Sequence, residues 1–261
     1  MNERHRTAEM PDRGAEYLLY QTLVGAWPLS AERAVAYMAK AMREAKLHTS
    51  WTNPDEAYDT ALESFIEAVL ANEDFAADLS AFVEPLIESG RINSLAMVLL
   101  KLTSPGIPDL YQGTELWDLS LVDPDNRKPV DYDRRASLLE SFGGDAPPEE
   151  VAAHVDAGAP KLLVTHRALE LRRERPMAFA GSYERLETGT DHLIGFVRGG
   201  EVAVLAPRLV LSRPPDWNEA NVSLPPGRWE NVFTRETIEG TATVGTILHD
   251  FPVALLARKV H

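Results

Sequence analysis

The chain is organised around one unusual segment, Pro105-Gly106-Ile107-Pro108-Asp109-Leu110-Tyr111-Gln112-Gly113-Thr114-Glu115. The preceding residues 103–106 end a helical pattern, because proline and glycine both oppose helix continuation. Residues 107–111 form a short, mainly apolar run, which predicts a short buried strand. A polar loop follows and extends from residue 112 to about residue 132.

Before this segment the sequence has a helical pattern. Apolar residues recur at helical spacing from residue 16 to about residue 102. The pattern predicts five helices. Pro28 ends the first, Ser30 and Asn53 are N-caps of the second and third, Gly90 ends the fourth, and the fifth begins at about Ile92. Residues 1–103 are therefore predicted to be a helical region.

After the segment the pattern changes to that of a sheet. Helices are predicted after Asp133 and over residues 160–173, and from Ser182 onward apolar residues alternate with polar ones. The predicted strands are residues 183–187, 192–197, 202–206, 221–224, 229–233, 242–247 and 253–257. The fold class is thus α+β, with an antiparallel β-sandwich over residues 179–261. Residues 104–178 are predicted to contain the short strand, the loop after it and the following helices.

The net charge of the chain excludes some classes of binding partner. The net charge is −14, and such a surface repels nucleic acid and anionic lipid head groups, whereas a neutral sugar meets no such repulsion. We therefore expect no nucleic-acid and no membrane partner. The chain has no cysteine, no apolar run of membrane-spanning length and no secretory pattern in its first residues, so a cytoplasmic location is expected.

The central segment carries a family resemblance. Residues 105–115 resemble the strand-8 motif of the alpha-amylase superfamily, a glycine-x-proline-x-x-tyrosine-x-glycine-x-glutamate pattern. Residues 116–127 and 129–132 narrow this resemblance to the maltooligosyltrehalose synthase family. Residues 17–28 and 44–54 support it, and residues 171–176 and 251–256 add weaker support.

This resemblance implies a fold and a reaction. Strand 8 closes a (β/α)₈ barrel, so residues 104–178 would be its last strand–helix unit and residues 1–103 an insertion between strands 7 and 8. The family converts the reducing-end α-1,4 link of a maltooligosaccharide into an α,α-1,1 link. The implied chemistry is a retaining glycosyl transfer that needs a carboxylate nucleophile and a carboxylic acid, and no cofactor or metal.

The resemblance also implies that the catalytic carboxylates are missing. In the superfamily they lie at the ends of strands 4, 5 and 7, which precede strand 8. A histidine–aspartate pair of the strand-7 type occurs here only as His249-Asp250, in the predicted sheet. We therefore predict no catalytic residue in this chain, which would be the C-terminal part of the enzyme, inactive alone, with a missing N-terminal catalytic half as its partner.

Asp109 and Glu115 are an alternative candidate pair of catalytic carboxylates. Asp109 and Glu115 would approach each other only if the chain reversed after Tyr111. Otherwise Glu115 holds the loop through hydrogen bonds to backbone amides, and Asp109 makes a buried or capping contact.

Five candidate substrate-binding residues belong to the central segment and the loop after it. Tyr111, Gln112 and Asp125 are candidates to reach sugar hydroxyls from the barrel mouth, and Glu115 lies between them. Trp117 is a candidate to stack on a sugar face or, alternatively, to anchor the loop through its apolar ring.

Three further candidates precede a predicted helix. Lys46, His48 and Trp51 form a polar and aromatic cluster that could cover the reducing end of the substrate and exclude water. The alternative buries Trp51 in the core. We favour a functional role for Lys46 and His48, because the sequence offers neither a capping nor a core role.

The acidic loop also permits two interpretations. Asp118, Asp123 and Asp125 could surround a calcium ion, since oxygen-rich loops bind it, although capping of turns is favoured. We therefore predict no metal site.

A strand 8 that lacks the neighbouring strands of the barrel is energetically unfavourable. Without its barrel neighbours it would expose unpaired backbone edges. We predict that this strand is disordered, paired with a second copy, or covered by the helical region. The competing hypothesis to an enzyme fragment is a stand-alone carbohydrate-binding or assembly module, which measurable oligosaccharide affinity without the missing half would favour.

Overall fold

The computed structural model describes residues 2–142, 146–212 and 217–259. The chain divides into two compact units: unit 1 comprises Met1–Ile87 and Leu119–Pro129, and unit 2 comprises Glu88–Asp118 and Val130–His261. Helix α4 (Glu73–Thr103) contributes residues to both units. No helix within the described ranges is long and apolar enough to cross a membrane.

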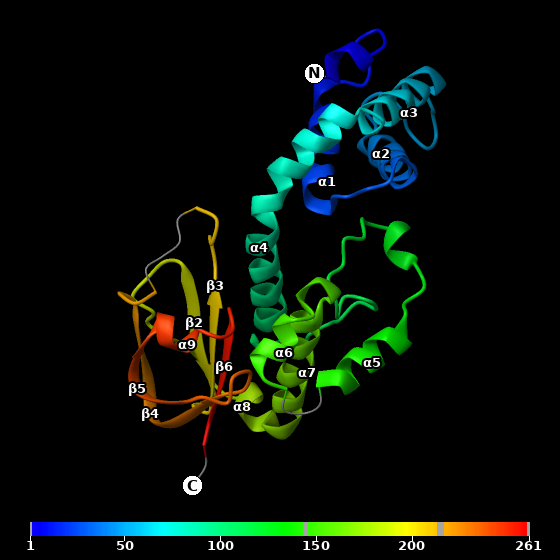
Figure 1. The fold of residues 1–261 in the computed structure, drawn as a ribbon. Helices are drawn as coiled ribbons and strands as arrows, with labels where there is room; N and C mark the ends of the chain where they lie inside the picture. Colours follow the sequence, from blue (N-terminus) through cyan, green and yellow to red (C-terminus); the bar gives the residue numbers. More distant parts are fainter. Residues whose placement is uncertain (1, 143–145, 213–216, 260–261) are drawn as a thin grey trace. The chain divides into compact units, whose positions relative to one another are not determined.

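Unit 1 is helical (Figure 1). Its elements are η1 (Asn2–His5), α1 (Arg13–Ala26), α2 (Ala31–Ala45), α3 (Glu56–Leu70), the first part of α4, and η2 (Asp125–Arg127). Apolar residues at helical spacing meet in one core, whose fully buried members include Leu19, Leu23, Met38, Phe65 and Ile66. Ser30 caps α2 as predicted, because its side chain accepts a hydrogen bond from the Arg33 amide.

Two predicted helix boundaries before residue 103 differ from the structure. The N-cap of α3 is Asp55, whose side chain accepts from the Tyr58 amide at 3.0 Å, while Asn53 closes a tight turn with Ser50. The fourth and fifth predicted helices form the single helix α4, which contains both Pro85 and Gly90. Both residues are exposed, and none of the described residues between Val83 and Leu95 is buried, so the helix continues here without a packed face.

Unit 2 combines helices with one sheet. Its helices are the end of α4, α5 (Tyr132–Phe142), α6 (Pro148–Ala152), η3 (Val155–Ala157), α7 (Ala159–Glu174), α8 (Pro176–Ala180) and α9 (Val244–Ile247). Its strands are β1 (Tyr183–Arg185), β2 (Leu193–Arg198), β3 (Val202–Pro207), β4 (Asn221–Asn231), β5 (Thr237–Thr243) and β6 (Ala254–Arg258). They pair antiparallel in the order β1-β2-β3-β6-β4-β5.

The predicted antiparallel sheet is present, but its layout differs from the predicted sandwich. The described strands form one continuous sheet, because β6 pairs with β3 on one side and with β4 on the other. Strand β4 spans two predicted strands, with an irregularity between Ser223 and Arg228. The end of the predicted strand 242–247 is instead the short helix α9.

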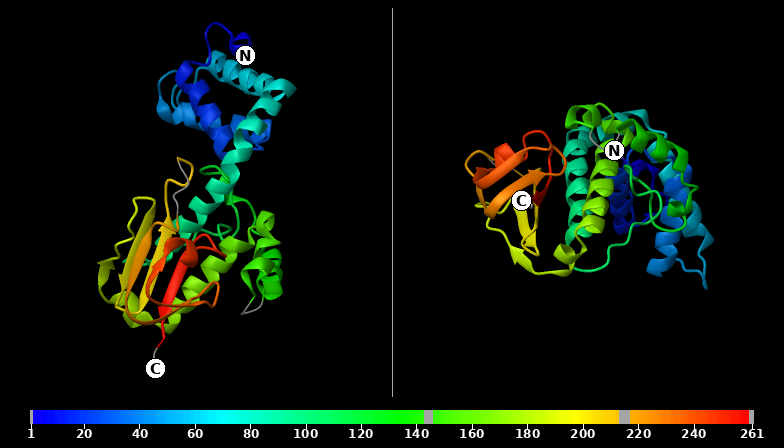
Figure 2. Two further views of the ribbon diagram at one scale, coloured as in Figure 1. Left: turned by 60° about the vertical axis from the view of Figure 1, so that its left-hand side comes forward. Right: turned by 90° about the horizontal axis from the view of Figure 1, so that it is seen from below.

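Strands β3 and β6 are buried on both faces. On β3, Val202 and Val204 belong to a core with the end of α4 and with α7, while Ala203 and Leu205 belong to a second core around Trp229. Successive side chains of a strand point to opposite faces, so one strand serves two cores. Figure 2 shows the sheet beside these helices.

The predicted buried strand at residues 107–111 is not formed. These residues are irregular, and Ile107 is 99% exposed. A strand needs neighbours that accept and donate its backbone hydrogen bonds, and none of the described strands pairs with this segment. Pairing with a second copy stays a prediction.

Candidate functional site

Four of the predicted substrate-binding residues lie in unit 2, in the turn that follows the irregular segment. Arg135 of α5 holds this turn: its guanidinium donates to Glu115 Oε2 at 2.9 Å, to the Gly113 carbonyl at 2.7 Å and to the Asp131 carbonyl at 2.9 Å. Gly113 has a φ of 91°, which favours glycine, and an added Cβ would lie 3.3 Å from the Val130 side chain. Glu115 therefore pairs with an arginine, whereas hydrogen bonds to backbone amides were predicted.

Tyr111 lines a cavity of about 770 Å³ together with Asp109 and Thr114. The Tyr111 side chain is partly exposed, and its carbonyl accepts from the Thr114 hydroxyl at 2.7 Å, which closes the turn. Gln112, at the tip of this turn, is exposed. Tyr111 and Gln112 are therefore accessible to a ligand, and Asp109 does not make the predicted buried contact because it is exposed.

Lys161 of α7 lines the same cavity and was not singled out from the sequence. Burial lowers the pKa of its ammonium, and the positive charge of Lys101 adds to this, although Asp118 and Glu115 act in the opposite direction. No described carboxylate forms an ion pair with it. The available sequence signal was a lysine in the first helical turn, followed directly by buried residues 162–165.

Replacing Lys161 with methionine is expected to raise the free energy of unfolding of unit 2 by about 1 kcal/mol, because the ammonium loses hydration without gaining an ion pair. Since its pKa is lowered by folding, the wild-type chain gains stability as pH rises through the folded pKa towards 10.5, and the variant lacks this gain. Urea unfolding at several pH values measures both effects, and the control is Arg173→Met, which removes an exposed positive charge from the same helix. A less stable Lys161→Met variant would contradict this prediction.

Trp117 lies in the arrangement expected of an anchor. Its indole Nε1 donates to the Val155 carbonyl at 2.6 Å, and its ring packs against the core. The Arg91 guanidinium lies 5.9 Å from the ring centroid. Gly158 has a φ of 86°, and an added Cβ would lie only 2.7 Å from the Trp117 amide nitrogen, so close packing fixes this end of the turn.

His48 lies in unit 1, in a cluster with Asp12 and Tyr58. Its Nε2 is 3.3 Å from Asp12 Oδ2, and its ring stacks on Tyr58 at 4.8 Å. The Tyr58 hydroxyl donates to the same Asp12 oxygen at 2.7 Å. Burial alone would raise the pKa of Asp12, but the hydrogen bonds from Tyr58 and from the backbone at the start of α1 outweigh it and lower that pKa. Burial, followed by the hydrogen bond to Asp12, raises the pKa of Tyr58.

The neighbouring candidates Lys46 and Trp51 are exposed. The Lys46 backbone caps α2 in the left-handed region, with a φ of 57°, and its amide donates to the Met42 carbonyl at 3.2 Å. Lys46 therefore has a capping role, contrary to the sequence prediction. Trp51 is 58% exposed, so the alternative that buries it is wrong, and the Arg43 guanidinium lies 5.0 Å from its ring centroid.

Asp125 is fully engaged within unit 1. Arg33 of α2 donates to its two oxygens at 3.0 and 2.8 Å, Lys128 lies 2.7 Å away, and the Leu121 amide donates at 2.7 Å. The Arg33 hydrogen bonds are the main reason why the pKa of Asp125 lies far below its ordinary value. Asp123, another acidic residue of this loop, pairs with cations of its own.

The structure thus brings the candidates together in two groups. Lys46, His48 and Trp51 lie between α2 and α3 in unit 1, which also contains Asp125. Tyr111, Gln112, Glu115 and Trp117 lie in one turn of unit 2. Arg33, which holds Asp125, and Arg135, which holds Glu115, were not predicted from the sequence.

Comparison with known proteins gives a consistent result. No family model matches the chain. A protein named maltooligosyl trehalose synthase from Mycobacterium tuberculosis is 36% identical over 263 residues, which cover 96% of this chain and 32% of that relative. The chain therefore spans about a third of the length of the curated relatives that it matches.

Solved structures agree with this match. The maltooligosyltrehalose synthase from Arthrobacter ramosus is 40% identical, with a TM-score of 0.83 over 94% of this chain and 32% of its own. A protein from Sulfolobus tokodaii, also named as a maltooligosyl trehalose synthase, is 32% identical, with a TM-score of 0.74 over 94% of this chain and 32% of its own.

Proposed function

Because the chain belongs to the maltooligosyltrehalose synthase family, we propose that it is the C-terminal part of an intramolecular transglucosylase. The proposed enzyme converts the reducing-end α-1,4 link of a maltooligosaccharide into an α,α-1,1 trehalose link. The observation that carries this proposal is the match over nearly the whole chain, in sequence and in fold, to about a third of each named synthase.

The proposed chemistry needs carboxyl groups that are free to react. A retaining transfer uses one carboxylate as the nucleophile and one carboxylic acid as the proton donor. Glu115 and Asp125 are engaged by Arg135 and Arg33, which fits residues that hold loops. We infer that an upstream N-terminal part supplies the reacting carboxylates, and that this chain alone is inactive.

The exposed surface of unit 2 supports an upstream partner. Ile107 is 99% exposed and Met97 is 69% exposed, and Met97 lines the same cavity as Tyr111. Exposed apolar side chains near an unpaired backbone segment are typical of a surface that another part covers. We propose that residues 104–178 complete a (β/α)₈ barrel with the upstream part, and that residues 107–111 gain strand hydrogen bonds there.

In the assembled enzyme we propose two sets of substrate contacts. Tyr111 and Gln112 would donate hydrogen bonds to sugar hydroxyls, since both are accessible. The exposed ring of Trp51 would stack on the apolar face of a sugar, with Lys46 and His48 beside it at the reducing end.

The experiment that tests the proposal uses the chain with and without an upstream part. Maltopentaose incubated with the chain alone is expected to keep its reducing ends. Adding the Arthrobacter ramosus synthase truncated before the matching third is expected to cause loss of reducing ends without release of glucose, because the transfer is intramolecular. Activity of the chain alone would refute its proposed inactivity. A stable complex that leaves maltopentaose unchanged would contradict the proposed reaction.

A second candidate function is a carbohydrate-binding module without chemistry. The exposed Trp51, with the Arg43 guanidinium against its ring, is the observation that favours it. Calorimetric titration of the chain alone with maltopentaose distinguishes the two functions. Binding that is lost in Trp51→Ala, together with no activity after addition of the upstream part, would favour the module.

A further inference from the structure

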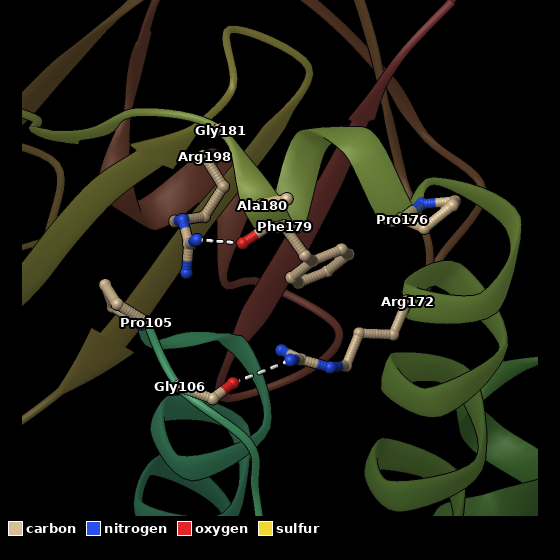
Figure 3. A pocket seen from close by; sticks show the side chains of 8 residues that line it. All are labelled: Pro105, Gly106, Arg172, Pro176, Phe179, Ala180, Gly181 and Arg198. Carbon is tan, nitrogen blue, oxygen red and sulfur yellow. Dashed lines mark hydrogen bonds between the residues drawn. The ribbon is translucent and has the colours of Figure 1, made fainter.

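A cleft of about 460 Å³ lies in unit 2 at the end of α4, and it is separate from the candidate residues discussed above (Figure 3). Arg172 of α7 and Arg198 of β2 line it, together with Gly106 and Phe179. Among the described residues that line this cleft, none is acidic. Two positive groups therefore share a recess without a negative one.

Arg198 is a buried cation, only 2% exposed. It donates to the carbonyls of Thr103 at 2.9 Å and Ser182 at 3.3 Å, and also to the carbonyl of Phe179. These carbonyls satisfy hydrogen bonds but do not neutralise a charge. Burial lowers the pKa of Arg198, and the positive charge of Arg172 lowers it further.

Arg172 approaches the same recess from α7. It donates to the carbonyls of Leu102 at 2.9 Å and Gly106 at 2.8 Å, and its guanidinium carbon lies 4.9 Å from the Phe179 ring centroid. Figure 3 shows both guanidinium groups directed towards the Pro105–Gly106 segment. In the part of the chain that the structure describes, no carboxylate forms an ion pair with either group, although the net charge is −14.

We propose that this cleft binds a small oxyanion, a phosphate or a carboxylate, between Arg172 and Arg198. Each Nη atom carries a second N–H, and Arg172 Nε makes no hydrogen bond to the described residues, so donors are available. A planar guanidinium fork matches the paired oxygens of such an anion. The anion would also relieve the repulsion between the buried Arg198 and the partly exposed Arg172, which carbonyl oxygens only partly offset.

The test is calorimetric titration of the whole chain with inorganic phosphate and, separately, with acetate. Sodium chloride keeps the ionic strength constant and serves as the reference salt. Saturable binding of at least one of phosphate and acetate is expected. Arg172→Gln is expected to weaken it at least tenfold, because one fork and one charge are lost. Arg173→Gln removes the same charge from the next position of α7, which is exposed and does not line the cleft, and is expected to change affinity less than twofold.

Arg172 also binds carbonyls at the end of α4, so circular dichroism first establishes that Arg172→Gln is folded. If it is not, Arg172→Lys carries the test, because it keeps the charge but loses the fork, and a weaker affinity is again expected. The proposal is overturned if neither anion binds saturably, or if Arg173→Gln weakens binding as much as the Arg172 variant.

Discussion

Replacing Arg33 with methionine is expected to lower the free energy of unfolding of unit 1 by about 2–3 kcal/mol. Arg33 makes two hydrogen bonds to Asp125 and a third to the Leu119 carbonyl at 2.9 Å. The two side chains are only 27% and 14% exposed, so solvent screens the pair weakly. Without Arg33, the partners of Asp125 among the described residues are Lys128 and the Leu121 amide.

Hydrogen exchange locates this effect in the 119–129 loop. The Leu121 amide donates to Asp125, and its exchange should accelerate in Arg33→Met. The matched control is Arg43→Met, which removes another ion pair of α2, to Asp59 at 2.7 Å on α3. That variant should lose stability without faster exchange at Leu121. Equal exchange in the two variants would contradict the assignment of Arg33 to the loop.

The acid sensitivity of unit 1 provides a second measurement of the same pair. Arg33 lowers the pKa of Asp125 in the folded state, so the stabilisation is complete above the unfolded pKa of about 4 and is lost as pH falls towards the folded value. Wild-type unit 1 should therefore lose stability below about pH 4. In Arg33→Met this loss should be smaller, because less stabilisation remains to be lost.

The helical region and the antiparallel sheet were predictable from the sequence, because periodicity is a local property. The helical region, the cap at Ser30 and the antiparallel sheet all follow from spacing within short windows. The same reasoning failed at residues 107–111. Their composition suits a strand, but a strand exists only with neighbours, and the described part of the chain supplies none. Local pattern therefore identified the segment but not its conformation.

For the site residues, too, local motifs identified the residues but not their partners. Motif spacing drew attention to Glu115 and Asp125, but their partners are 20 and 92 residues away in the chain, at Arg135 and Arg33. A pairing over such separations depends on how the helices pack, which no local pattern encodes. The capping role of Lys46 was missed because a non-glycine residue in the left-handed region carries only a weak sequence signal.

Replacing Arg135 with methionine is expected to have the second large effect, a loss of about 2 kcal/mol in the free energy of unfolding of unit 2. One guanidinium holds Glu115 and the carbonyls of Gly113 and Asp131, and its side chain is only 16% exposed. Truncation leaves a half-buried carboxylate without its cation. Amide exchange of residues 113–117 should accelerate, because Trp117 then anchors the turn from one end only.

Arg134→Met is the matched control. Arg134 is exposed and adjacent to Arg135 in the chain, and the substitution removes the same charge. It should leave both stability and exchange close to wild type.

After addition of the upstream part, Arg135→Met should raise the KM for maltopentaose more than it lowers kcat, because a looser turn misplaces Tyr111 and Gln112 without removing them. Arg135→Lys should recover only part of this loss, because an ammonium cannot reach three acceptors as a planar fork does. If exchange of the turn is unchanged in Arg135→Met, then Trp117 and the packing at Gly158 hold it without Arg135.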